Sequence, residues 1–173
     1  MHILIWLANP PTLSEIDVII RAEIPDPLVD PKLHALVVKH MLHGPCGQLN
    51  PGCGCMRDGR CRFKYPKAYV SETQNAEGFP EYRRRSPEEG GNTYTKVVNG
   101  EEFEYTNAWV APYSPFLLRT FECHINVEFC ASIKAIKYIC AVSCFVSHIL
   151  FLCMANLLLF STSTKDPTPA STL

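Results

Sequence analysis

A segment rich in cysteine and glycine, HMLHGPCGQLNPGCGCMRDGRC at residues 40–61, constrains the fold more than any other part of the chain. Its glycines and prolines interrupt helices and strands, so we expect turns rather than a regular element. Such turns bring closely spaced thiolates together, and Zn²⁺ takes four nitrogen or sulfur ligands in a tetrahedron. The sequence therefore predicts a structural zinc site whose ligands are His43, Cys46, Cys55 and Cys61.

Alternatives to this ligand set stay open. Cys53 competes with Cys55, because two residues separated by one rarely both reach the same ion comfortably. The spacing matches no common zinc-finger pattern, so free thiols in a surface loop at 43–67 are the other interpretation. The nine cysteines are an odd number, and the sequence has no Asn-x-Ser/Thr glycosylation site and a poor signal peptide. These features favour a reducing compartment.

Two helices are predicted in the first quarter of the chain. Thr12 and Glu15 form a capping box, in which each side chain bonds to the backbone of the other residue, ahead of a short helix. Asp30 followed by Pro31 is typical of a second helix start, and Gly44 lies where a terminal glycine belongs. Apolar positions at helical spacing give this second helix one buried face, which comprises Leu33, Leu36, Val37, His40 and Met41.

Strand signals do not alternate regularly with these helices. HILIWL at residues 2–7 and TFECHINVEF at 120–129 read as strands, and ASIKAIKYI at 131–139 reads as a helix. Asn99-Gly100 predicts a hairpin turn ahead of GEEFEYTNAWV, which alternates polar and aromatic side chains. The polar, turn-prone segment 71–100 is expected to be mobile. The irregular order predicts an α+β fold with a mainly antiparallel sheet.

The formal net charge is only −1, but much of the positive charge is segregated into two clusters. Local basic patches contact phosphates even on a neutral chain, and a solvated surface is the alternative interpretation. The first cluster comprises Arg57, Arg60, Arg62, Lys64 and Lys67, and the second comprises Arg83, Arg84 and Arg85.

The stretch NAWVAPYSPFLLRTFECHINVEFCASIKAIKYIC closely resembles the N-terminal Rep-like domain of Helitron transposon proteins. HGPCG, DGRCRFKYPK and MHILIWL match other blocks of that domain in the expected order, so the resemblance covers residues 1–140. It implies a partial HUH endonuclease-like fold from a nuclear protein. The parent domain nicks and joins single-stranded DNA with a divalent metal such as Mg²⁺ or Mn²⁺.

The resemblance also assigns site residues by position. In the family, two histidines on one strand hold the metal, and a helical tyrosine attacks the phosphodiester. His2 matches the second histidine, and Tyr138 matches the first of two tyrosines, with Lys134 on the same helix face. Val142 stands where the second tyrosine is expected, and the first histidine would precede Met1. We therefore expect a fragment whose nicking site is inactive.

Further expectations follow from the same resemblance. His124 and Glu128 are candidates to line the nicking cleft, with a satisfied core histidine as the alternative. Both basic clusters are expected to give weak, salt-sensitive binding of single-stranded DNA. The family's helicase domain is absent, because no Gly-Lys dipeptide occurs, so no nucleoside triphosphate binding is expected. A nuclease that uses Tyr138 alone with a replacement metal ligand is a further alternative.

The tail at residues 141–173 is unrelated to this domain. Eighteen of the 22 residues from 139 to 160 are apolar and none is charged, so a helix of this length could span a bilayer. An apolar C-terminal helix here would make the chain a membrane-anchored protein of unknown role, located at a membrane. The alternative is a translated intron, since Val142-Ser143 is what a common splice-donor sequence encodes.

Overall fold

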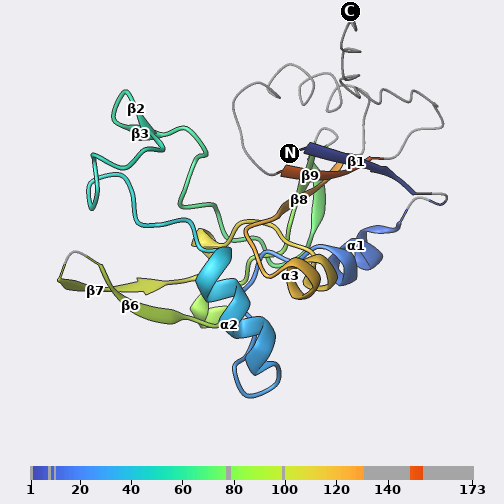
Figure 1. Ribbon diagram of the computed structural model, residues 1–173, viewed down its shortest axis with the longest axis horizontal. Helices are drawn as coiled ribbons and strands as arrows, with labels where there is room; N and C mark the ends of the chain where they lie inside the picture. Colours follow the sequence, from blue (N-terminus) through green and yellow to red (C-terminus); the bar gives the residue numbers. More distant parts are fainter. Residues whose placement is uncertain are drawn as a thin grey trace, which may run out of the picture.

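The computed structural model describes residues 2–7, 9, 11–76, 79–98, 100–130 and 149–153 (Figure 1). Helices and small sheets are mixed within these residues, as expected of an α+β chain. The helices are α1 (Leu13–Ile19), α2 (Pro31–His40) and α3 (Pro115–Phe121), with 3₁₀ turns η1 (Pro87–Glu89) and η2 (Asn107–Trp109). The strands are β1 (His2–Trp6), β2 (Met56–Arg57), β3 (Arg60–Cys61), β4 (Gln74–Ala76), β5 (Phe79–Glu81), β6 (Tyr94–Val98), β7 (Glu101–Tyr105), β8 (Asn126–Cys130) and β9 (Ile149–Cys153).

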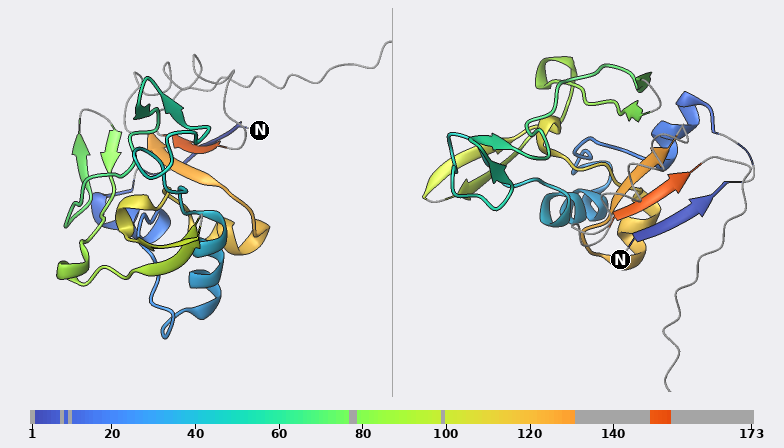
Figure 2. Two further views of the ribbon diagram at one scale, coloured as in Figure 1. Left: turned by 90° about the vertical axis from the view of Figure 1, so that its left-hand side faces the viewer. Right: turned by 90° about the horizontal axis from the view of Figure 1, so that it is seen from above.

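The largest described sheet is parallel, which differs from the antiparallel sheet that the sequence predicted. Its order is β1–β9–β8, and β9 pairs in parallel with both neighbours. Long connections separate these strands in the sequence, as parallel pairing requires. The pairs β2–β3, β4–β5 and β6–β7 are antiparallel hairpins. The β2–β3 and β6–β7 hairpins lie at one end of the long axis, and the parallel sheet lies at the other (Figures 1 and 2).

Strand β9 lies inside the segment that was predicted to form an apolar helix, so that prediction is wrong for residues 149–153. An apolar run without a polar face has no periodicity that distinguishes a helix from a buried strand. The remainder of 139–160 lies outside the described residues. Among the residues that the structure does describe, no helix is both long and apolar enough to cross a bilayer.

Both helix starts in the first quarter of the chain are confirmed. The capping box forms between Thr12 and Glu15, and the Asp30 carboxylate accepts a bond from the backbone N–H of Leu33 at 3.1 Å. Helix α2 buries the predicted apolar face but ends at His40, so Gly44 is not its terminal glycine. The chain turns earlier because His43 donates its backbone N–H to the Trp109 carbonyl.

A buried segment at residues 107–113, which we call the spine, connects the other elements. It holds the core side chains of Trp109, Val110 and Tyr113. Backbone groups from both earlier and later segments bond to it, so it acts as a central strand for short pieces of chain. The bonded pairs are Arg21 with Tyr113, Met41 with Ala111, His43 with Trp109, Lys67 with Ala108 and Val127 with Pro112.

The segment 71–100, which was predicted to be mobile, carries β4, β5, η1 and β6. Gly91 shows how closely part of it packs, because a Cβ atom there would collide with the carbonyl oxygen of Arg85. The predicted hairpin is confirmed by the β6–β7 pairing, with Gly100 at a φ of 87°. The expected strand at 120–129 begins later, at Asn126, because its first residues complete helix α3.

Candidate metal centre and the adjoining cleft

The four residues predicted to bind zinc converge in the structure. The ligand atoms of His43, Cys46, Cys55 and Cys61 all lie within 4.8 Å of one another. The Cys61 Sγ and His43 Nε2 atoms are 3.6 Å apart. Tetrahedral zinc with Zn–S near 2.3 Å and Zn–N near 2.0–2.1 Å requires an S···N edge of about 3.6 Å. The cluster can therefore hold a metal ion such as zinc.

A tight hairpin brings two of these cysteines together. Strands β2 and β3 are joined by Asp58-Gly59, whose φ values of 49° and 73° are those of a type I′ turn. The pairing places Cys61 beside the start of β2, and Arg62 donates its backbone N–H to the Cys55 carbonyl at 2.9 Å. We call residues 44–67 the knuckle. Its Asp58-Gly59 turn, and the glycines that precede the hairpin, can be read from the sequence.

The electrostatics of the thiols favour a cation between them. Burial, together with neighbouring thiols, raises the pKa of Cys55, and burial raises the pKa of Cys46. Burial acts in the same direction on Cys61, but backbone N–H groups of Tyr65 and Phe63 donate to its sulfur and the net pKa is lowered. A bound metal ion would convert all three thiols to thiolates and remove the cost of crowding them.

The structure favours Cys55 over Cys53 as the ligand. Cys55 is 6% exposed and belongs to the cluster, whereas Cys53 is only partly buried and lies beside it. The two sulfur atoms are 3.4 Å apart, which shows how closely these alternatives compete.

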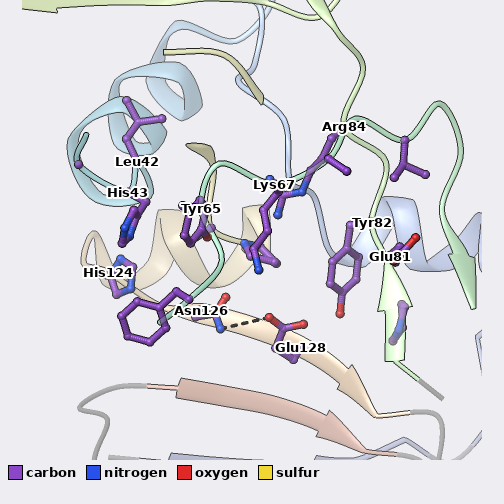
Figure 3. A pocket seen from close by; sticks show the side chains of 17 residues that line it. Leu42, His43, Tyr65, Lys67, Glu81, Tyr82, Arg84, His124, Asn126 and Glu128 are labelled. Carbon is purple, nitrogen blue, oxygen red and sulfur yellow. Dashed lines mark hydrogen bonds between the residues drawn. The ribbon is translucent and has the colours of Figure 1, made fainter. Parts of the chain in front are cut away.

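A cleft of about 480 Å³ adjoins the metal centre (Figure 3). His43 belongs to both, because its Nε2 faces Cys61 while its ring lines the cleft. The ring stacks on Tyr65 at a centroid distance of 4.1 Å and an interplanar angle of 10°. Burial lowers the pKa of His43, so its imidazole is held neutral, as metal ligation requires.

Opposite charges meet in the same cleft. Figure 3 shows Lys67 extending toward Asn126 and Glu128. Burial lowers the pKa of Lys67 and raises the pKa of Glu128. The Asn126 amide donates to Glu128 Oε1 at 3.3 Å, and its own Oδ1 is buried without a hydrogen-bond partner in the described part of the chain. The cleft is therefore lined by two cations, Lys67 and the carbonyl-bonded Arg84, and by several hydrogen-bond acceptors.

His124 and Glu128, which the sequence suggested for a nicking cleft, line the cleft beside the metal centre, and their part in nicking stays a prediction. His124 bonds through Nδ1 to the His40 carbonyl at 2.7 Å, which leaves Nε2 for other partners. Sequence reasoning missed Asn126 and Tyr65. The alternation of His124, Asn126 and Glu128 at every second residue was the available signal, because such residues share a strand face.

The second basic cluster is structural, which corrects the prediction that Arg84 contacts DNA. Arg84 is 5% exposed, and its Nη1 donates to the carbonyls of Asn107 and Val110 at 2.7 and 2.6 Å. Burial lowers the pKa of Arg84, although the carbonyls and surrounding acids hold its positive form. This guanidinium binds the spine and is not available to phosphates.

The charges of Arg83 and Arg85 are also paired, with Glu23. Arg85 Nη2 lies 2.8 Å from Glu23 Oε2, and Arg83 Nε lies 3.4 Å from the same oxygen. Burial alone would raise the pKa of Glu23, but hydrogen bonds from Arg85 and both positive charges outweigh it and the pKa is lowered. Both guanidiniums therefore share Glu23, and the expectation that these two arginines bind DNA stays a prediction.

The residues assigned by resemblance to nicking are placed only in part. The backbone of His2 pairs with Ile149 in β9, which pairs in turn with Asn126 in β8. Tyr138 and Lys134 lie outside the described residues, as does Val142. No family model and no curated protein matches the chain. A function must therefore be argued from the site.

Proposed function

We propose that this chain is a single-stranded DNA-binding domain of the Helitron Rep-like class. A structural zinc ion stabilises it, and it is inactive as a nuclease. The observation that carries the proposal is the position of His43, which belongs to both the metal cluster and the cleft wall. Metal binding therefore builds one side of a cleft and fixes the basic knuckle next to it. Zinc has a structural role here, because four protein ligands leave no open coordination position.

The knuckle offers positive charge that no acid neutralises. Its exposed basic side chains have no ion-pair partner among the described residues, in contrast to Arg83 and Arg85. Unpaired, exposed cations on a rigid hairpin can bind phosphates without first breaking an ion pair. The residues concerned are Arg57, Arg60, Arg62 and Lys64.

Aromatic rings accompany this charge. Phe63 is 36% exposed, and the Arg62 guanidinium lies over its ring at 4.6 Å from the centroid. Single-strand binding proteins combine a basic track with aromatic faces on which unpaired bases stack. Phe63 also contacts the His43 ring edge to face, so the stacking surface is continuous with the cleft.

Nicking is a separate matter from binding. Val142 occupies the position of the family's second tyrosine, which removes one of two nucleophiles. We therefore propose that neither Tyr138 nor a bound Mg²⁺ or Mn²⁺ ion cleaves DNA in this chain. Incubation with a labelled single strand should give no covalent adduct, and an adduct that Tyr138→Phe abolishes would overturn this part of the proposal.

The experiment for binding is fluorescence anisotropy of a labelled dT12 oligonucleotide with the zinc-loaded chain. We expect the double variant Arg57→Gln/Arg60→Gln to bind about tenfold more weakly. Its slope of log K against log salt should fall by about 0.7 for each lost phosphate contact. The matched control is Lys39→Gln/Lys96→Gln, which removes two exposed charges outside the knuckle. Equal losses in both variants, or no binding by the parent chain, would contradict the proposal.

A further inference from the structure

We infer that the cleft beside the metal centre binds one unpaired nucleobase of the bound strand and prefers guanine. The inference rests on the proposed single-strand binding and names the base that the cleft selects. It depends on the polar groups that the cleft presents, on its size and on its aromatic wall. Of the four cluster residues, only His43 lines the cleft, and it does so with its ring.

The hydrogen-bond acceptors of the cleft match a base edge that is rich in donors. Asn126 Oδ1 is buried and without a partner in the described residues, a state that is unfavourable unless a ligand supplies a donor. Glu128 accepts bonds from the Asn126 amide at 3.3 Å and from Tyr82, and its oxygens keep further lone pairs beside Asn126. Guanine presents adjacent N1–H and N2–H donors, which two neighbouring acceptors can receive.

A cationic donor lies opposite these acceptors. The Lys67 side chain extends over the Tyr65 ring, with Nζ 5.1 Å from the centroid, toward Asn126 and Glu128 (Figure 3). No ion pair between Lys67 and Glu128 is present in the described structure, so the ammonium can still donate. Guanine O6 is an acceptor next to N1–H, and Lys67 is the group that can bind it.

Other occupants fit these groups less well. A backbone phosphate carries no donor, so it would leave the acceptors of Asn126 and Glu128 unpaired. A metal cation would meet the Lys67 ammonium in the same cleft. Adenine and thymine each carry one donor on the pairing edge, and therefore leave one of the two acceptors unpaired.

The shape of the cleft also suits a base. Its volume of about 480 Å³ falls within the range of about 300–1,000 Å³ that is usual for small-molecule sites. Tyr65 and His43 stack on each other and give the cleft an aromatic wall that a base can contact. This contact holds a base in the cleft, and the hydrogen bonds select which base.

The test is an NMR titration of the zinc-loaded, ¹⁵N-labelled chain with dGMP, dIMP, dAMP and dTMP. We expect dGMP to shift the amide signals of Lys67 and Val127, at the cleft, and to bind about tenfold more tightly than dIMP, which lacks the exocyclic amine. Glu128→Gln replaces an acceptor with an amide of the same shape and should remove this preference. Lys67→Met should weaken dGMP binding, because it removes the donor to O6.

Two outcomes separate the inference from the proposed function. Equal responses to the four nucleotides, or shifts confined to residues away from the cleft, would overturn the inference while dT12 binding still stands. A parent chain that selects dGMP but fails to bind dT12 would overturn the proposed function instead. Retention of the dGMP preference by Glu128→Gln, with its amide spectrum otherwise unchanged, would overturn the assignment of Glu128.

Discussion

Two clusters of basic residues look alike in the sequence and have opposite positions in the structure. The knuckle presents its charges to solvent, on a hairpin that is held by the His43 and cysteine cluster. The 83–85 cluster directs its charges inward, to Glu23 and to carbonyls of the spine. The difference is in the partners. The 83–85 cluster reaches Glu23 and buried carbonyls of the spine, whereas the knuckle cations form no ion pair with any described residue and Arg57 bonds only to the neighbouring Met56 carbonyl.

The comparison shows that density of charge does not identify a nucleic-acid surface. A guanidinium that satisfies buried carbonyls contributes to folding, and losing it leaves unpaired acceptors in the core. An exposed guanidinium on the knuckle hairpin contributes little to folding and remains free for a ligand. The following changes are chosen to separate these two roles.

Removal of the metal should have the largest effect. Structural zinc contributes on the order of 10 kcal/mol in zinc-finger peptides, so Cys55→Ser should abolish stoichiometric zinc binding and unfold the knuckle. Hydrogen exchange should then rise throughout 46–64 and stay unchanged at 83–85. Zinc content by mass spectrometry and exchange by peptide mapping give the readout. Cys123→Ser is the control, because Cys123 is exposed and outside the cluster, and equal zinc loss there would contradict the ligand set.

Replacement of Arg84 should have the next largest effect. Arg84→Met leaves the carbonyls of Asn107 and Val110 without their buried donor, and we expect the free energy of unfolding to fall by about 3 kcal/mol. Urea denaturation measures this change. Arg57→Met, on the exposed knuckle, should change stability by less than about 0.5 kcal/mol. Similar losses in the two variants would show that the clusters do not differ as described.

The smallest expected effect is the pH dependence of the Glu23 ion pairs. Because the folded pKa of Glu23 is lowered, its stabilisation is present above the ordinary value near 4.5 and is lost as pH falls below that value. Glu23→Gln should therefore cost about 1–2 kcal/mol at pH 7 and progressively less toward pH 3. Thermal unfolding across this range tests the sign. Glu72→Gln, at an exposed position, should show no such dependence.

The metal site could be predicted from sequence, whereas the inward turn of the second basic cluster could not. His43, Cys46, Cys55 and Cys61 have a chemistry that few other roles require, and the Asp58-Gly59 turn fixes their hairpin locally. The donors and acceptors around Arg84 are backbone carbonyls from distant segments, which no local pattern reveals. Every residue has a backbone carbonyl, so the sequence does not show which carbonyls will accept bonds from Arg84.

For secondary structure too, features set by nearby residues could be predicted, and features set by distant segments could not. The capping box at Thr12 and the start of α2 at Asp30 were predictable, because both depend on residues within one turn. The strand at 149–153 and its parallel pairing were not, since a continuous apolar run lacks periodicity and its partners lie far away. Helix α3 was missed because, unlike the equally short α1, it starts without a capping box.

The spine has a consequence for the order in which a ribosome makes this protein. Residues near 21, 41 and 67 must wait for 107–113 before their backbone bonds can form. At about 5–20 residues per second this delay is on the order of ten seconds, during which apolar segments are exposed to chaperones and to other nascent chains. All four metal ligands, by contrast, have been synthesised by residue 61. We therefore expect zinc capture to precede closure of the core during translation.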